Sequence, residues 1–81
     1  MKLNVVMSSN AVTRDVLRKF FGECGFVVLM SDNVAAVRDR LCEGFTSCLF
    51  VVDCLIDGME EFYRETKEHA SWSKAGFVSF T

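Results

Sequence analysis

The sequence predicts an α/β fold around a parallel sheet, in the order β-α-β-α-β-α-β. Four short apolar segments alternate with three segments whose apolar residues recur at helical spacing. Glycines or residues that commonly cap helices stand between most of these segments. Such alternation favours parallel pairing, because right-handed crossovers place a helix over the sheet after each strand. With 81 residues, we expect one domain over residues 1–81.

The first strand and helix are predicted within residues 2–25. Residues 2–7 are β-branched and almost continuously apolar, which suits a strand covered on both faces. Residues 8–10 (Ser-Ser-Asn) supply N-cap side chains for the helix, which Gly25 should end. The predicted apolar face of this helix consists of Val12, Val16, Leu17, Phe20, Phe21 and Cys24.

The second strand and helix follow the same pattern. Residues 26–30 are expected to form a second buried strand, and residues 31–33 (Ser-Asp-Asn) offer caps for the next helix. Gly44 should end this helix, whose apolar positions are Val34, Val37 and Leu41.

The remaining elements are predicted between residue 48 and the last residue. Residues 48–52 form the most hydrophobic strand, and the Asp-Gly pair at 57–58 indicates a turn. Residues 59–70 have the apolar stripe of a surface helix. A connector at 71–75 then leads to a fourth strand at 76–81.

Composition excludes several classes of protein. The net charge is −2 and the basic residues are scattered, so no basic face for nucleic acid is expected. No apolar run approaches the roughly 20 residues of a membrane span, and no secretory signal follows Lys2, so we expect a cytoplasmic protein. One histidine and widely spaced cysteines make no zinc or redox motif. We predict four buried free thiols, at Cys24, Cys42, Cys48 and Cys54.

The carboxyl ends of the strands are the place to look for a site. In open parallel sheets, ligands meet this edge near the point where the winding direction changes. Polar side chains stand there at Ser8, Ser9, Asp53 and Thr81.

These positions resemble the receiver domain of bacterial two-component response regulators, which has a flavodoxin-like fold. In that family an acidic pair closes the first strand, an Arg follows in the first helix, a phosphoacceptor Asp closes the third strand and a hydroxyl residue closes the fourth. Arg14, Asp53 and Thr81 match three of these positions. The resemblance covers the whole chain but lacks the final α-β-α part of a receiver, including the Lys on its fifth strand.

Two departures put the family's phosphoryl chemistry in doubt. Ser8 and Ser9 replace the acidic pair, and each missing carboxylate forfeits on the order of several kcal/mol of attraction to a divalent ion a few ångströms away. Lys67 and Lys74 do not occupy the family's Lys position. We therefore expect no metal site, with weak Mg²⁺ binding at most, and interpret Asp53 as a retained but largely inert carboxylate.

Other polar residues have two interpretations each. Ser8 and Ser9 either cap the first helix, the plainer interpretation, or accept or bind an anion at its N-terminus. His69 either places a favourable charge at a helix C-terminus or donates a phosphoryl group. Trp72 is either an interface anchor or the edge of the core.

Three functions follow as hypotheses. The first is a non-enzymatic, receiver-like signalling module that acts through a protein partner and self-association. Without a fifth strand the fourth strand is unpaired, which favours a homodimer. The alternative is the N-terminal portion of a longer response regulator that is phosphorylated on Asp53. A small enzyme using Asp53 or a cysteine is the third, and we expect no catalysis because no base or phosphate-binding loop accompanies either.

Overall fold

The predicted order of strands and helices is confirmed. The structure is a computed structural model that describes residues 2–44, 47 and 49–80. Its four strands form one all-parallel sheet in the order β2-β1-β3-β4. The elements are β1 (Leu3–Met7), α1 (Ala11–Glu23), β2 (Val27–Ser31), α2 (Val34–Cys42), β3 (Leu49–Asp53), α3 (Met59–Glu68) and β4 (Gly76–Phe80).

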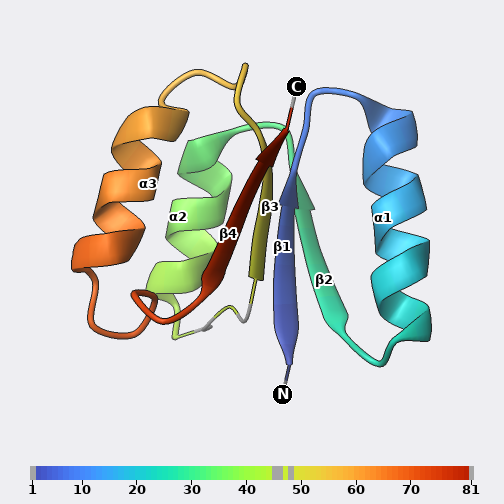
Figure 1. Ribbon diagram of the computed structural model, residues 1–81, viewed down its shortest axis with the longest axis horizontal. Coiled ribbons are helices and arrows are strands. Elements are labelled where there is room, and N and C mark those ends of the chain that lie inside the picture. Colours follow the sequence, from blue (N-terminus) through green and yellow to red (C-terminus); the bar gives the residue numbers. More distant parts are fainter. Residues whose placement is uncertain (1, 45–46, 48, 81) are drawn as a thin grey trace.

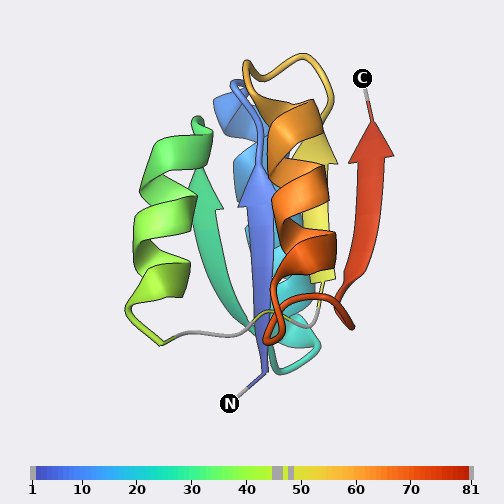
Figure 2. The same ribbon diagram turned by 90° about the vertical axis from the view of Figure 1, so that its left-hand side faces the viewer.

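The helices lie on both faces of the sheet. Figure 1 shows α1 on one face and α2 and α3 on the other, with the sheet between them. Together with the strand order, this arrangement makes the chain a flavodoxin-like α/β fold through its fourth strand. In Figure 2, β4 stands at the edge of the sheet beyond α3, and no helix lies behind it.

The main core lies between the sheet and the pair α2 and α3. Phe50 of β3 and Phe62 of α3 are fully buried and meet edge to face, with ring centroids 5.6 Å apart. Trp72 belongs to this core, so of its two interpretations the interface anchor is wrong. His69 stacks on the Trp72 ring at 3.7 Å between centroids, and its Nδ1 accepts a hydrogen bond from the Ser71 amide.

The α1 face of the sheet is much less covered than the face that carries α2 and α3. No residue of α1 is buried, and the side chains of Val12, Val16 and Phe20 are 72%, 59% and 58% exposed. The helix packs mainly on β1 and β2, and the flank that carries these three residues is largely exposed. β2 is likewise an edge strand with exposed and half-buried positions, so its predicted burial is wrong.

Two of the predicted N-cap residues cap their helices: Asn10 caps α1 and Asn33 caps α2. The Asn10 side chain accepts hydrogen bonds from the amides of Val12 and Thr13, and Asn33 accepts one from Ala36. α3 instead begins at Gly58, whose φ of 82° is a left-handed conformation that glycine adopts without strain.

The prediction of buried thiols is wrong for the cysteines that the structure describes. Cys24, Cys42 and Cys54 are free and exposed, and Cys48 lies outside the described residues. Each exposed cysteine stands at the end of an element, following α1, closing α2 or following β3. Their position at element ends overrides the general tendency of free cysteine to be buried.

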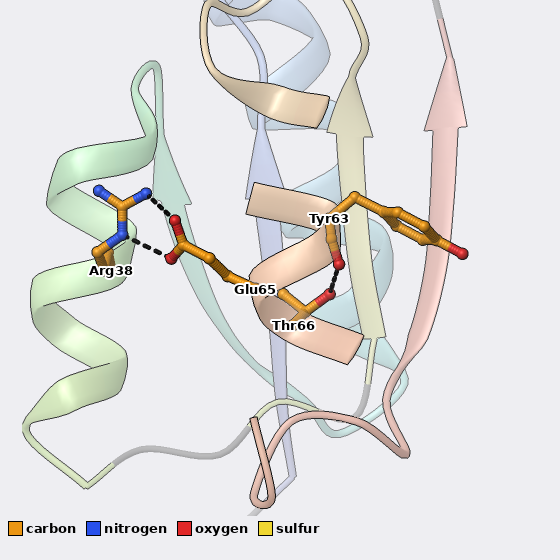
Figure 3. Close-up of polar contacts among 4 residues, drawn as sticks. All are labelled: Arg38, Tyr63, Glu65 and Thr66. Carbon is orange, nitrogen blue, oxygen red and sulfur yellow. Dashed lines mark hydrogen bonds and ion pairs between the residues drawn. The ribbon is translucent and has the colours of Figure 1, made fainter. Parts of the chain in front are cut away.

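One ion pair joins the two helices of the core face. Arg38 of α2 donates Nε and NH2 hydrogen bonds of 2.9 and 2.7 Å to the two carboxylate oxygens of Glu65 on α3 (Figure 3). These bonds raise the pKa of the Arg38 guanidinium above its ordinary value. Both side chains remain partly exposed, so the pair adds about 1 kcal/mol at most to the stability.

Within the described part of the chain, no helix combines the length and hydropathy needed to cross a bilayer.

Candidate functional site at the carboxyl end of the sheet

The strand register brings two of the predicted site residues together. Met7 pairs with Val52, so Ser8 and Asp53 follow side by side at the ends of β1 and β3. Asp53 also pairs with Phe80, the last described residue of β4. Thr81 lies outside the described residues, so its predicted place as the hydroxyl residue of the site stays a prediction.

Asp53 is both the end of its strand and the start of a turn. Its side chain is 9% exposed, and Oδ1 accepts a 3.0 Å hydrogen bond from the Leu55 amide. Its carbonyl oxygen accepts a second bond, of 3.1 Å, from the Ile56 amide. A carboxylate that closes its own turn in this way is held by the backbone, which is a common structural use of Asp.

The two serines differ in their surroundings. Ser8 is buried, its amide donates to the Ser31 carbonyl at 3.1 Å, and its Oγ accepts from the Asn10 amide at 3.1 Å. Ser9 is exposed. Asn10 is therefore the cap of α1, and the predicted capping by Ser8 and Ser9 is wrong; Ser8 instead bonds to the turn that leads to the helix.

Arg14 supplies a positive charge at this edge. Its NH1 donates a 2.6 Å hydrogen bond to the carbonyl oxygen of Ser8. Helical side chains lean toward the helix N-terminus, and Arg14, in the first turn and a half of α1, therefore reaches back to the strand end. The resemblance predicts the place of Arg14 but not this contact, because a backbone acceptor leaves no signal in the sequence.

This donor set does not fit Mg²⁺, the ion that the receiver resemblance implies. The site offers the Asp53 carboxylate, which is already hydrogen-bonded, and two serine hydroxyls. The positive Arg14 guanidinium nearby repels a metal cation. In residues 2–44, 47 and 49–80, no cluster of three or more His, Cys, Asp or Glu side chains could hold a metal ion. Lys67 lies near Ala75 at the opposite end of β4, and Lys74 precedes that residue.

A second feature, which no sequence pattern indicates, lies between α3 and β4. A groove of about 550 Å³ opens there, lined by Cys54, Met59, Glu60, Tyr63, Phe77 and Ser79. Tyr63 points from α3 toward β4 (Figure 3) and meets the Phe77 ring edge to face at 4.8 Å. We call this feature the β4 groove. It depends on which elements leave β4 uncovered, and local residue spacing does not reveal that.

Comparison with known proteins adds no relative: no family model matches the chain, and no curated protein or solved structure matches it significantly.

Proposed function

We propose that this chain is a non-catalytic, receiver-like regulatory module that acts through protein–protein contacts, including self-association. The observation that carries the proposal is the charge at the carboxyl end of the sheet. There, Ser8 lies beside the carboxylate of Asp53, Ser9 follows it in the chain, and Arg14 donates a hydrogen bond to the Ser8 carbonyl. Aspartyl phosphorylation depends on electrostatic stabilisation of the transferred group by a divalent ion, which this set of residues binds poorly.

Exposed apolar surface supports the part of the proposal that concerns contacts with other protein chains. Val12, Val16 and Phe20 form a stripe at i, i+4 and i+8 on α1, which we call the α1 stripe. The β4 groove is a second apolar surface on the opposite face of the sheet. Contiguous apolar surface on a small protein is typical of contacts with another chain.

A magnesium titration tests the proposal that this site binds Mg²⁺ poorly and is not phosphorylated. We expect calorimetry of the 81-residue chain to detect no Mg²⁺ binding at millimolar concentration, and acetyl phosphate with Mg²⁺ to leave no phosphoryl adduct on Asp53 by mass spectrometry. The Ser9→Asp variant should gain Mg²⁺ affinity, by about tenfold or more, because it adds a carboxylate at an exposed position beside the site. Ser71→Asp, which adds the same charge at an exposed position far from the site, is the matched control.

The alternative function, a response regulator phosphorylated on Asp53, predicts both Mg²⁺ binding and a phosphoryl adduct. Stoichiometric phosphorylation of Asp53 in the unaltered chain would refute the non-catalytic proposal and favour a working receiver. Equal gains in affinity for the Ser9→Asp and Ser71→Asp variants would show that local charge at the strand ends is not what limits metal binding.

A further inference from the structure

We propose that two copies of this chain pair through the outer edge of β4, antiparallel, about a two-fold axis at Val78. The sheets of the two copies then form one continuous eight-stranded sheet. The inference rests on the proposed self-association and specifies its surface. Three independent features of the β4 edge carry it: the direction of the backbone groups, the sizes of the side chains and the charges on α3.

The backbone of β4 presents a complete set of groups for this pairing. The Phe80 carbonyl points toward β3, where it accepts a 2.8 Å bond from the Cys54 amide. Because N–H and C=O groups alternate in direction along a strand, Gly76, Val78 and Phe80 all face β3. The amides and carbonyls of Phe77 and Ser79 therefore face the outer edge, where the described residues place no strand.

A two-fold axis at Val78 satisfies all four of these outward groups. It places Phe77 opposite Ser79 of the second copy, and Ser79 opposite Phe77 of that copy. Each of these is a hydrogen-bonded pair that exchanges two bonds, which gives four bonds across the interface. Val78 then faces its own counterpart in the pair without hydrogen bonds, where side chains come closest.

The side chains of β4 fit this register. Phe77 and Ser79 line the β4 groove on the α3 face, so each large ring comes to lie beside a small hydroxyl of the second copy. Val78 lies on the other face and is 50% exposed, and it would be covered by its counterpart. The two grooves also join across the axis, because a two-fold axis perpendicular to the sheet keeps α3 of both copies on one face.

The charges on α3 are self-complementary about the same axis. Glu60, Tyr63 and Lys67 lie on the flank of α3 that faces β4. The first two line the groove, and the Lys67 Nζ is 5.5 Å from the centre of the Tyr63 ring. α3 runs opposite to β4, with its Glu60 end near Cys54 and its Lys67 end near Ala75. The axis reverses this direction, so Glu60 of each copy lies at the same end of the interface as Lys67 of the other.

The other edge strand, β2, differs from β4 in how its faces are covered. β2 is flanked by α1 on one face and α2 on the other, and both helices contact it. Val27 of β2 is 49% exposed, almost the same as Val78 of β4, so exposure alone does not distinguish the two edges. This similarity makes Val27 the matched control for a test of β4.

Charge substitution at the axis tests the proposal. In sedimentation experiments we expect the unaltered chain to dimerise at micromolar concentration. We expect Val78→Lys and Val78→Glu each to weaken the dimer about tenfold or more, because like charges then meet across the axis. An equimolar mixture of the two variants should recover dimers that contain one copy of each. Val27→Lys should dimerise like the unaltered chain.

Amide exchange supplies a second readout that reports the register. Exchange of the Phe77 and Ser79 amides should slow as protein concentration rises. The Val78 amide, bonded to β3 within one copy, should be protected at every concentration in proportion to the stability of the fold. Exchange of the Phe77 and Ser79 amides that does not slow under conditions where the chain dimerises would contradict the proposed edge pairing.

The outcomes separate this inference from the function on which it rests. If the unaltered chain dimerises and Val78→Lys does so equally well, the β4 interface is refuted while self-association stands. Loss of the dimer in Val16→Lys but not in Val78→Lys would place the interface on the α1 stripe and equally refute the β4 edge. A well-folded monomer at micromolar concentration would overturn both the interface and the proposed self-association, and would leave the magnesium test unaffected.

Discussion

Asn4 places an amide in the middle of the sheet. Its side chain is 1% exposed, and neither Oδ1 nor Nδ2 has a hydrogen-bond partner among the described residues. Its neighbours in the ladder, Val28 and Leu49, are apolar. Burying a polar group without a partner costs about 1–3 kcal/mol, so this residue opposes the stability of a fold that is already small.

Replacing Asn4 should therefore stabilise the protein. We expect Asn4→Val to raise the free energy of unfolding by about 1–3 kcal/mol, because it removes the unpaired amide and suits a buried parallel strand. Urea denaturation followed by circular dichroism measures this change. The reverse substitution two residues along the strand, Val6→Asn, is the matched control and should destabilise by a similar amount. A lower stability for Asn4→Val would show that the amide has a partner after all.

At the scale of the elements, alternating apolar segments predict the order of strands and helices well. Each strand and helix lies within a few residues of its predicted bounds, because hydrophobic period and caps are local properties. Which other elements surround a helix or strand is not a local property of its sequence. The apolar period of α1 correctly places Val16 and Phe20 on an apolar flank, but no sequence pattern says whether another element covers that flank.

The sequence likewise predicts some features of the candidate site and misses others. Ser8 and Asp53 are predicted together because parallel strands end at a common edge. The bond from Arg14 to the Ser8 carbonyl is missed, because it depends on the angle at which α1 leaves β1. The β4 groove is missed because it depends on which elements leave β4 uncovered, and residue spacing does not reveal that.

The contrast between the two faces leads to a prediction about two phenylalanines. Phe62 of α3 is fully buried against Phe50, whereas Phe20 of α1 is 58% exposed. We expect Phe62→Ala to lower the free energy of unfolding by about 3–5 kcal/mol, and Phe20→Ala by less than about 1 kcal/mol. Chemical denaturation at one protein concentration compares the two. Equal losses would mean that the flank of α1 is packed in solution.

As a whole molecule, the chain is compact without being fully covered. Its radius of gyration is 11.5 Å, close to the roughly 12 Å expected of a globular domain of this length. Yet the α1 stripe, the β4 groove and both sheet edges remain accessible. A small domain has only about 5–15 kcal/mol of stability, so covering such surface by association changes its stability appreciably.

The coupling of folding to association is the property that distinguishes a dimer of this kind from a stable monomer. If unfolding releases two separate chains, each tenfold rise in protein concentration adds about 1.4 kcal/mol per dimer and raises the thermal midpoint by about 3–6 °C. Differential scanning calorimetry over a range of concentrations measures this slope. We expect it for the unaltered chain and for Val27→Lys, whereas Val78→Lys should have a lower midpoint than either at each concentration, because its dimer is weaker. A midpoint of Val78→Lys equal to that of Val27→Lys at every concentration would mean that the stabilising contact lies away from β4, since a charge at the axis weakens the β4 pairing.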